Sequence, residues 1–347
     1  MDRIKKILST NLVTGGIGFI GSHVAAVFLE AGYEVLIIDK SSKKRGIQHI
    51  KDIVGLSEKS KKLLFFQIDM LNYDALLEVF LSNTDIDAVI HLAGLKSVAK
   101  SNFCPLLYYQ NNLVSSINLL RVMEDTGVNK LLFSSSAFVY EESDTQISEN
   151  AKLMPKTPYA SSKAMIEKIM SDVQKSAPEY WHIGCMRYFN PVGAHQSGKI
   201  GEEVTNESCN LVPIIAQVAA GEKQCVTIFG DDYETRDGTT IRDYVHITDL
   251  AYGHISALKK IAEKPTYCVY NIGTGIGTSV IEMIKFFEKV SGCKIPYKIG
   301  KRREGDLKML VADPSKSLAE LNLKCEKSVL EMCADFWKWK QIGEKDI

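Results

Sequence analysis

Membrane spans, targeting segments and a dominant charge are all missing from this sequence. No apolar run reaches the roughly 18 residues that a membrane-crossing helix needs. The N-terminal stretch MDRIKKILSTN lacks the long apolar core and the small-residue cleavage site of a signal peptide. Its 42 basic and 42 acidic side chains cancel, which argues against nucleic acid or an anionic membrane as the main partner. We therefore expect a small-molecule ligand, no nucleic acid partner and no membrane partner.

Cysteine and histidine patterns for metal binding are also missing. The eight cysteines are scattered without a CxxC pair, and no HExxH sequence occurs. Scattered cysteines are typical of reduced thiols rather than of a disulfide framework. We expect a cytoplasmic protein without a metal site.

What the chain does contain is a regular alternation of two kinds of segment over its first 190 residues. Short apolar runs, typical of buried parallel strands, occur at 7–13, 35–39, 63–69, 87–93, 130–136 and 182–190. Helical spacing occurs between them, notably at 22–31, 72–82, 104–126 and 159–177. Strands and helices in alternation predict an α/β fold with a Rossmann-like, doubly wound parallel sheet.

The regular alternation of strands and helices ends after residue 190. Beyond it, short strands and turns mix with helices at 207–221, 247–262 and 278–290. We interpret residues 1–190 as a nucleotide-binding domain and residues 191–347 as a smaller α/β lobe. One late apolar run, CVYNIG at 268–273, is expected to return to the main sheet.

A glycine-rich turn between the first strand and the first helix indicates a dinucleotide site. The stretch TGGIGFIGSH (14–23) places glycines at 15, 18 and 21, where missing side chains and a helix N-terminus suit a pyrophosphate. Asp39 ends the second strand and can bind both ribose hydroxyls, which favours NAD over NADP. Lys40 and the basic run at 43–45 weaken that preference. Asp69, after the third strand, could reach an adenine or cap the helix that begins near residue 72.

A tyrosine and a lysine four residues apart, Tyr159 and Lys163, follow the serine-rich end of the fifth strand at 134–136. Residues at i and i+4 share one face of a helix. A neighbouring ammonium, together with a cationic nicotinamide ring, would lower the pKa of a phenol toward neutrality, as a tyrosine base requires. Tyr297 and Lys301 have the same spacing but follow no such strand, so we interpret Tyr297 as structural.

Taken together, these stretches resemble the extended short-chain dehydrogenase/reductase family and, within it, the UDP-galactose 4-epimerases. The resemblance covers nearly the whole chain and rests on the sequences VTGGIGFIGSH, VIHLAGLKSVAKS, LYYQNN, LFSSSAFVYE, PYASSK, RYFNPVGAH, IFGDDYETRDGTTIRDYVHITDLA, YNIGTG and RREGDL. It implies an NAD-dependent isomerase that interconverts UDP-galactose and UDP-glucose. In such an enzyme the sugar is oxidised at C4, turns over as a 4-keto sugar, and is reduced on its other face.

The resemblance also implies roles for individual residues. Tyr159 would be the base, Ser136 would share its proton, and Lys163 would assist and hold the nicotinamide ribose. The implied cofactor-binding residues are Gly15, Gly18, Phe19, Ile20, Gly21, Asp39, Lys40, Asp69, Met70, Leu92, Ala93, Gly94, Lys96, Asn111, Ser134, Tyr159, Lys163 and Tyr188. The implied substrate-binding residues are Lys96, Ser136, Tyr159, Phe189, Asn190, Asn210, Leu211, Thr227, Phe229, Arg242, Tyr244, Arg303, Asp306 and Leu310. Among these, Arg242 and Arg303 would bind the diphosphate, Phe229 the uracil and Asp306 the ribose.

Several positions depart from the family pattern. Lys40 replaces the usual asparagine after the NAD aspartate, and Phe138 stands two residues after Ser136, where threonine is usual. The segment 204–209 lacks the usual proline and glycine residues. Leu310 occupies the position that gates N-acetylated sugars, and its intermediate size leaves their acceptance open.

Two alternatives to an epimerase are compatible with a chain of this family. A nucleotide-sugar dehydratase or decarboxylase of the same family would place acidic residues directly after Ser136, where this chain has Ala137 and Phe138. A non-catalytic sensor of NAD or a UDP-sugar would be expected to lack the base. The family resemblance further implies a homodimer through the helices at 104–126 and 159–177.

Overall fold

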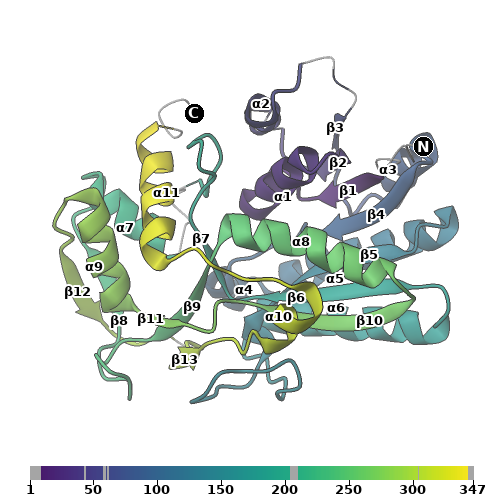
Figure 1. Ribbon diagram of the computed structural model, residues 1–347. Coiled ribbons are helices and arrows are strands. Elements are labelled where there is room, and N and C mark those ends of the chain that lie inside the picture. Colours follow the sequence, from purple (N-terminus) through teal and green to yellow (C-terminus); the bar gives the residue numbers. More distant parts are fainter. Residues whose placement is uncertain are drawn as a thin grey trace.

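Seven parallel strands form the central sheet of the computed structural model (Figure 1). The structure describes residues 9–42, 44–57, 60, 62–203, 210–303 and 305–342. Along the sheet the strands follow the order β10-β6-β5-β4-β1-β2-β3, and every neighbouring pair is parallel. Their bounds are Thr10–Thr14 (β1), Glu34–Asp39 (β2), Leu63–Gln67 (β3), Ile86–His91 (β4), Lys130–Ser136 (β5), His182–Tyr188 (β6) and Thr266–Ile272 (β10).

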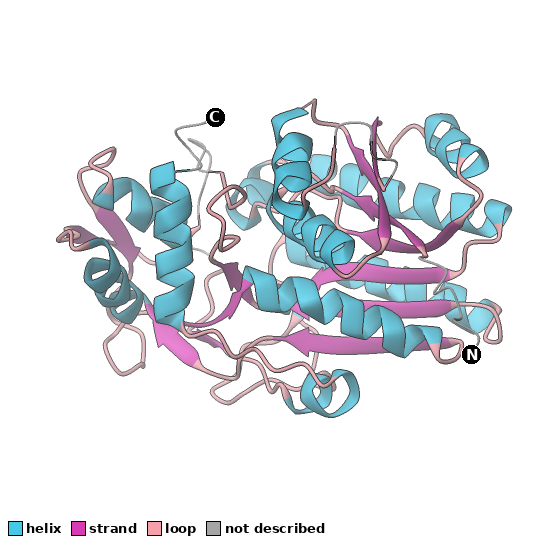
Figure 2. Ribbon diagram, turned by 45° about the horizontal axis from the view of Figure 1, so that its top comes forward, coloured by secondary structure: helices cyan, strands magenta, loops and turns pink. Residues whose placement is uncertain are grey.

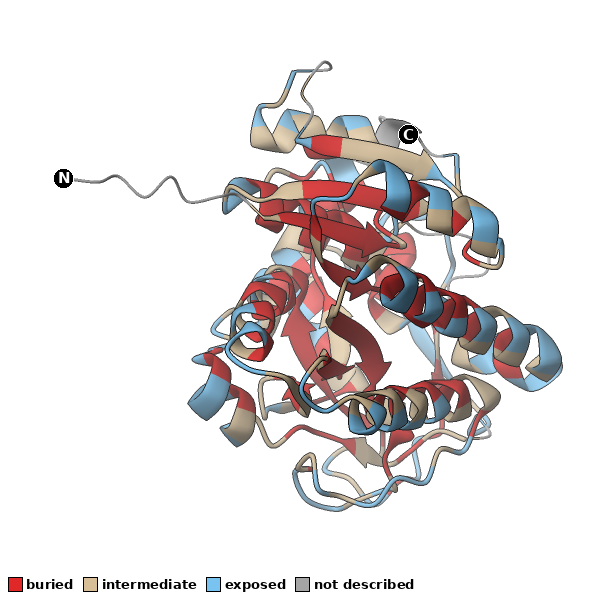
Figure 3. Cartoon of the chain, turned by 90° about the vertical axis from the view of Figure 1, so that its right-hand side faces the viewer, coloured by how far each residue is buried: buried red, intermediate tan, exposed pale blue. Residues whose placement is uncertain are grey.

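Helices cover both faces of this sheet, as Figure 2 shows. One face carries α1 (Phe19–Glu30), α2 (Lys44–Val54), α8 (Ile247–Ala262) and α10 (Ser315–Leu321); the other carries α3 (Tyr73–Ser82), α4 (Val98–Phe103), α5 (Pro105–Thr126) and α6 (Pro158–Ser176). Successive residues of a strand point to opposite faces. Val13 therefore joins the apolar core under α1 and α8, whereas Leu12 joins the core under α3 and α5. Both cores are buried, so they appear red within the sheet in Figure 3.

A smaller lobe lies beyond the carboxyl ends of the strands (Figure 1). Its strands are β7 (Asn190–Val192), β8 (Val226–Phe229), β9 (Ile241–His246), β11 (Gly277–Ser279), β12 (Tyr297–Gly300) and β13 (Met309–Leu310). Its helices are α7 (Leu211–Ala219), α9 (Val280–Ser291) and α11 (Val329–Ile342), and a short 3₁₀ helix, η1 (Ala137–Val139), follows β5. The lobe has its own apolar core, in which α7, α9 and α11 pack against β8.

The sheet predicted from the sequence is confirmed, and so is the return of the late strand, since β10 pairs with β6. The predicted strand at 182–190 is wrong at its end: β6 stops at Tyr188, and β7 pairs with β9 in the smaller lobe. The predicted helix at 207–221 corresponds to α7, with 207–209 outside the described residues. The boundary between residues 190 and 191 remains our prediction for the division into domains.

Four helices of the described chain, α2, α4, α10 and α11, were not predicted. The basic residues at the start of α2 and Gly46 make its amphipathic pattern hard to recognise in the sequence. In the structure Ile47 and Ile50 face the apolar core under α1. None of the described helices is both long and apolar enough to cross a membrane.

Candidate functional site

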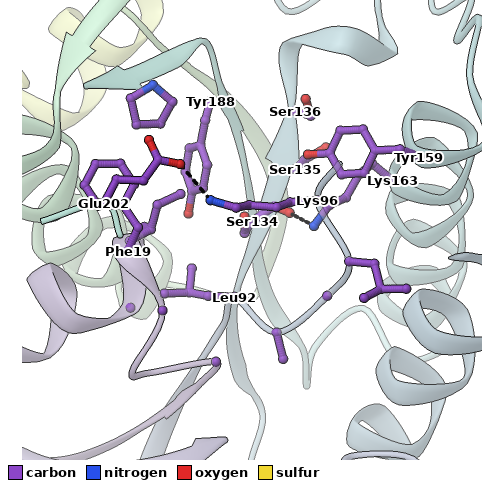
Figure 4. A pocket seen from close by; sticks show the side chains of 18 of the residues that line it. Phe19, Leu92, Lys96, Ser134, Ser135, Ser136, Tyr159, Lys163, Tyr188 and Glu202 are labelled. Atoms are coloured by element: carbon purple, nitrogen blue, oxygen red, sulfur yellow. Dashed lines mark hydrogen bonds and ion pairs between the residues drawn. The ribbon is translucent and has the colours of Figure 1, made fainter. Parts of the chain in front are cut away.

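A cavity of about 440 Å³ lies where the carboxyl ends of the main-sheet strands meet the smaller lobe. Its lining comes from the ends of β1, β2, β4, β5 and β6 and from α7 and β9 of the smaller lobe. Ligands of doubly wound sheets bind at this end of the strands, and the volume suits a small-molecule site. Figure 4 shows the cavity with the side chains of the serine-rich strand end on one side and Glu202 on the other.

The glycine-rich turn between β1 and α1 forms one wall. Gly15 has φ +67°, a conformation that side chains disfavour, and a Cβ there would lie 2.9 Å from the Ala93 backbone. A Cβ on Gly21 would lie 2.2 Å from the carbonyl oxygen of Gly15. Gly18 directly precedes α1, whose first residue is Phe19. The turn therefore presents bare backbone and a helix N-terminus to the cavity, an arrangement that suits a diphosphate.

Two acidic residues follow along the same edge of the sheet. The Asp39 carboxylate accepts backbone N–H groups from Ser41 at 2.9 Å and Ile17 at 3.4 Å, and each oxygen keeps a lone pair for another donor. Asp69 also lines the cavity, and its side chain accepts the Leu71 N–H at 3.0 Å. Asp69 does not cap α3, because the N-cap is Asn72, which accepts from the Ala75 N–H. The capping role for Asp69 is therefore wrong, and its contact with a ligand stays a prediction.

The first turn of α6 brings Tyr159 and Lys163 to the tip of β5. Thr157 caps this helix and Pro158 opens it, which fixes where the helix begins. The Lys163 ammonium donates to the Ser134 carbonyl oxygen at 2.6 Å and lies 6.0 Å from the centre of the Tyr159 ring. Ser136 is buried and, with Tyr159, lines the cavity (Figure 4). A phenol, a hydroxyl and an ammonium thus converge on one point of the cavity wall.

Burial dominates the protonation of these groups. It raises the pKa of Tyr159, and a hydrogen bond with Ser136 partly opposes this effect. It also lowers the pKa of Lys163 to about 8, against the attraction of Glu167. The sequence led us to expect a lowered tyrosine pKa, which is wrong for the protein alone, since Lys163 is not among the causes that act on Tyr159.

All the cofactor-binding residues expected from the sequence line this cavity. So do the following expected substrate-binding residues: Lys96, Ser136, Tyr159, Phe189, Asn190, Asn210, Leu211 and Tyr244. The Asn190 side-chain oxygen is buried and has no hydrogen-bond partner among the residues that the structure describes, so it has an acceptor to offer to a ligand. Six expected residues do not line the cavity, namely Thr227, Phe229, Arg242, Arg303, Asp306 and Leu310.

Four of those six residues form a group in the smaller lobe, the Asp306 cluster (Phe229, Arg242, Arg303 and Asp306). The Asp306 carboxylate accepts from Arg303 at 2.8 and 3.2 Å and lies 3.9 Å from the Arg242 guanidinium. The Arg303 guanidinium lies 4.8 Å from the centre of the Phe229 ring. Arg242 is buried, and among the described residues it donates only to the Ile241 carbonyl besides this loose pairing, so it has donors left for an anion.

Two residues of β9 and β13 connect this cluster to the cavity. Tyr244 lines the cavity two positions after Arg242 on the same strand. Leu310 is fully buried in an apolar cluster with Phe189, and Phe138 packs against that cluster. Phe138 and Phe189 line the cavity, whereas Leu310 does not. A residue that gates the sugar would have to face the cavity. Leu310 does not face it directly.

Glu202 is the main charged group that sequence reasoning missed. Its buried carboxylate lines the cavity and accepts from Lys96 at 3.0 Å and from Asn210 at 2.8 Å (Figure 4). No motif marks it, since its partner Lys96 is 106 residues away along the chain. Phe138, the departure from the family pattern beside Ser136, also lines the cavity, as do Leu95 and Ser135 within the stretches 93–96 and 134–136. The other lining residues not expected from the sequence are Ile38, Ile68, Val98, Ser115, Pro191, Val192, Val212 and Pro213.

The remaining motif residues have structural roles. His246 is fully buried, caps α8 and contacts Asp335 at 3.1 Å, so its contacts are those of a core histidine. Tyr297 lies on β12, half exposed and away from the cavity lining. Across the described part of the chain, no three His, Cys, Asp or Glu side chains gather as metal ligands.

Comparisons with known proteins show the family to which the chain belongs. The chain matches a family model described as GDP-mannose 4,6 dehydratase over residues 12–336. It is 45% identical over 332 residues to the UDP-glucose 4-epimerase of Bacillus subtilis. The match covers 95% of this chain and 96% of that protein.

Solved structures give the same result. The fold is similar to the UDP-glucose 4-epimerase of Bifidobacterium longum in complex with NAD+ and UDP, with a TM-score of 0.92, 41% identity and coverage of 98% of this chain and 100% of that one. It is equally similar to the Stenotrophomonas maltophila enzyme with bound NAD and formylated UDP-arabinopyranose, with a TM-score of 0.92, 39% identity and the same coverage. The chain belongs to the UDP-glucose 4-epimerases of the extended short-chain dehydrogenase/reductase family.

Proposed function

We propose that this protein is an NAD-dependent epimerase that interconverts UDP-galactose and UDP-glucose at C4 of the sugar. The observation that carries the proposal is the meeting, in one cavity, of the glycine-rich turn, Asp39 and the Ser136–Tyr159–Lys163 group. The first two suit a dinucleotide, and the third suits proton transfer at a hydroxyl beside it. The relatives named above carry this activity in their names.

NAD is the cofactor that fits the cavity. The backbone at Gly15 and the N-terminus of α1 would hold its diphosphate, with Lys96 nearby. Asp39 would accept from the adenosine ribose hydroxyls and would repel a 2′-phosphate. Bound there, NAD supplies a ring that accepts a hydride from C4 and returns it.

The proton at the sugar 4-hydroxyl is moved by the residues at the end of β5. We assign Tyr159 as the base and Ser136 as the hydroxyl that shares the proton. Lys163 lies close enough to favour the phenolate, because an ammonium stabilises a neighbouring negative charge. Since burial raises the pKa of Tyr159, we infer that the cationic nicotinamide ring adds to the charge that Lys163 provides.

The nucleotide half of the substrate would be bound by the smaller lobe. Arg242 and Arg303 have the guanidinium geometry that suits a diphosphate, and Phe229 offers a flat, partly exposed ring for uracil. Asp306 would bind the ribose, and Thr227 lies on the same strand as Phe229. Facing the sugar we place Phe189, Asn190, Asn210, Leu211 and Tyr244, which line the cavity.

A dehydratase of the same family fits the site less well. The family model carries a dehydratase's description, but such a reaction needs an acid or base beside the strand-end hydroxyl to move a second proton. In this chain Ala137 and Phe138 occupy the positions after Ser136. Of the described lining residues, the acids are Asp39, Asp69 and Glu202, and Glu202 is already paired with Lys96. A non-catalytic sensor is disfavoured because the base, the hydroxyl and the ammonium are all present.

We also propose that the enzyme is a cytoplasmic homodimer. Leu107, Val114 and Ile117 are exposed on α5, and Met165 is exposed on the adjacent α6. Apolar side chains on two neighbouring helices are typical of an interface. The cysteines in the described ranges are free thiols, which supports a reducing compartment.

The test is turnover without added cofactor. Purified protein is incubated with UDP-galactose, first alone and then with NAD, and the sugar nucleotides are followed by proton NMR. We expect UDP-glucose to form until the two sugars reach equilibrium. The absence of UDP-glucose under both conditions would refute the proposal, and a 4-keto-6-deoxy product would indicate the dehydratase instead.

A further inference from the structure

The Lys163 ammonium is buried without an acid in contact. Its hydrogen bond goes to the neutral Ser134 carbonyl, and within the described residues no carboxylate oxygen lies within 4.0 Å of it. A buried ammonium tends to lose its proton, because a low dielectric disfavours charge. Yet Lys163 can assist Tyr159 only while it is charged. Some other group must therefore help to keep the proton on Lys163.

Glu167 is the acid placed to do so. It lies four residues after Lys163 on α6, so it shares the same helix face one turn farther on. Its carboxylate is 3% exposed, and its charge is the one effect that opposes the loss of the Lys163 proton. Coulomb attraction reaches farther in a buried site than at the surface, so direct contact is not required.

Arg187 of β6 holds this carboxylate in place. Its Nε donates to Glu167 Oε1 at 2.9 Å and a terminal nitrogen donates to Oε2 at 2.6 Å, so the ion pair is bidentate. Arg187 also donates to the Tyr140 hydroxyl at 2.8 Å and to the Glu149 carbonyl at 3.1 Å. The pair is thus fully satisfied, with side-chain exposures of 5% and 3%.

The same carboxylate is bound to the tip of β5. The Ser135 hydroxyl donates to Glu167 Oε1. Ser135 stands between Ser134, whose carbonyl accepts from Lys163, and Ser136, which faces Tyr159. Glu167 therefore constrains the backbone that carries both groups. A buried ion pair is a weak source of stability, so its location at this strand end calls for another explanation.

We propose that Glu167 is a positioning residue, which holds the positive charge on Lys163 and fixes the serine-rich end of β5 from behind the cavity. This inference rests on the proposed function, because it assigns Lys163 a role in the epimerase reaction. Glu167 does not line the cavity, so on this proposal it acts through Lys163 and Ser135.

The direction of the effect follows from the titratable groups around Lys163 in the part of the chain that the structure describes. His91 on β4 is buried, and its pKa is lowered to about 3, so it is neutral. Tyr159 on α6 and Tyr188 on β6 have raised pKa values and are neutral as well. The charged groups that remain near Lys163 are Glu167 and its partner Arg187. Removing the Glu167 charge leaves Arg187 unbalanced, and both changes lower the pKa of Lys163.

The experiment compares the pH dependence of kcat in the wild type, Glu167→Gln and Glu167→Asp. The wild type should lose activity as pH rises through the Lys163 pKa of about 8. Glu167→Gln keeps the size and most hydrogen bonds but not the charge, so this loss should begin about one pH unit lower. Glu167→Asp keeps the charge and should restore the wild-type profile. Thermal unfolding of each variant separates these changes from loss of fold.

A second readout does not depend on turnover. The rate at which acetic anhydride modifies Lys163 is followed against pH by mass spectrometry, which reports the pKa of Lys163 directly. We expect a lower value in Glu167→Gln than in the wild type. An unchanged labelling profile in a folded Glu167→Gln protein would overturn the inference. If labelling shifts but the wild type shows no epimerase activity, the proposed function fails and the charge relation stands.

Discussion

At the scale of single residues, the chemistry depends on a phenol that must lose its proton near neutral pH. A tyrosine has an ordinary pKa near 10, so a base at pH 7 needs a shift of about 3 units, or roughly 4 kcal/mol. In this protein burial acts in the opposite direction on Tyr159. Nearby positive charge has to supply the difference, and the buried Lys163 is the protein's own source of it.

Replacing Tyr159 by phenylalanine should therefore remove the base and little else. We expect kcat to fall at least about 100-fold, the usual contribution of a general base, with an unchanged melting temperature. The matched control is Tyr297→Phe, which alters the other tyrosine with a lysine four residues later. It should keep wild-type activity, because Tyr297 is half exposed on β12. A fully active Tyr159→Phe protein would show that the base is misassigned.

Phe138 should set the room available for the sugar. It lines the cavity two residues after Ser136, whereas Leu310 is buried behind it. We expect Phe138→Ala to raise kcat/KM for UDP-N-acetylgalactosamine relative to UDP-galactose about 10-fold, the order of effect that a change in pocket volume produces. Leu310→Ala should change this ratio less. The ratio is measured by competition between the two substrates, and a larger effect at Leu310 would contradict this assignment.

At the scale of elements, the segment between β12 and β13 carries charges that the substrate should meet. Arg303 belongs to the Asp306 cluster, while its neighbour Arg302 pairs with Asp232 at 2.8 Å and lies over the Tyr233 ring. Both arginine side chains are nearly half exposed.

Arg303→Ala should raise the KM for UDP-galactose about 10-fold or more, as loss of a charged contact to phosphate does, with a smaller change in kcat. Arg302→Ala is the matched control and should leave KM unchanged, because its partners lie outside the cluster. Isothermal titration with UDP gives the same comparison without turnover. Equal losses in both variants would mean that general charge, rather than a specific contact, attracts the substrate.

The elements differ in how far the sequence alone could predict them. The glycine-rich turn, the strand ends and the Tyr159–Lys163 pair were predictable because each depends on residues close together in the chain. Glu202 was not, since its partners Lys96 and Asn210 come from other segments. The Glu167–Arg187 ion pair was not predicted for the same reason, because it joins a helix to a strand residue 20 positions later. The gate at Leu310 stays a prediction, and the burial of Leu310 in one apolar cluster with Phe189 depends on the fold.

At the scale of the whole molecule, each of the two lobes supplies a different part of the site. The main sheet supplies the dinucleotide wall and the proton-transfer group, and the smaller lobe supplies the Asp306 cluster and α7. A substrate that spans both lobes would join them through its own contacts. Ligand binding should therefore stabilise the folded protein as a unit.

The proposed dimer makes a separate prediction for the molecule. Ile117→Asp places a charge on the exposed apolar stripe of α5, and burying that charge in an interface would be costly. We expect the variant to run as a monomer in multi-angle light scattering. Leu81→Asp, an equally apolar and exposed position on α3, should remain a dimer. A wild-type monomer, or a dimeric Ile117→Asp variant, would place the interface elsewhere or remove it.

The central claim is that C4 of the sugar loses and regains the same hydride within one cavity. UDP-galactose carrying deuterium at C4 is incubated with the protein in ordinary water, and the product is analysed by NMR and mass spectrometry. The account predicts UDP-glucose that keeps its deuterium at C4, because the hydride never exchanges with water. UDP-glucose with hydrogen from the solvent at C4 would contradict it.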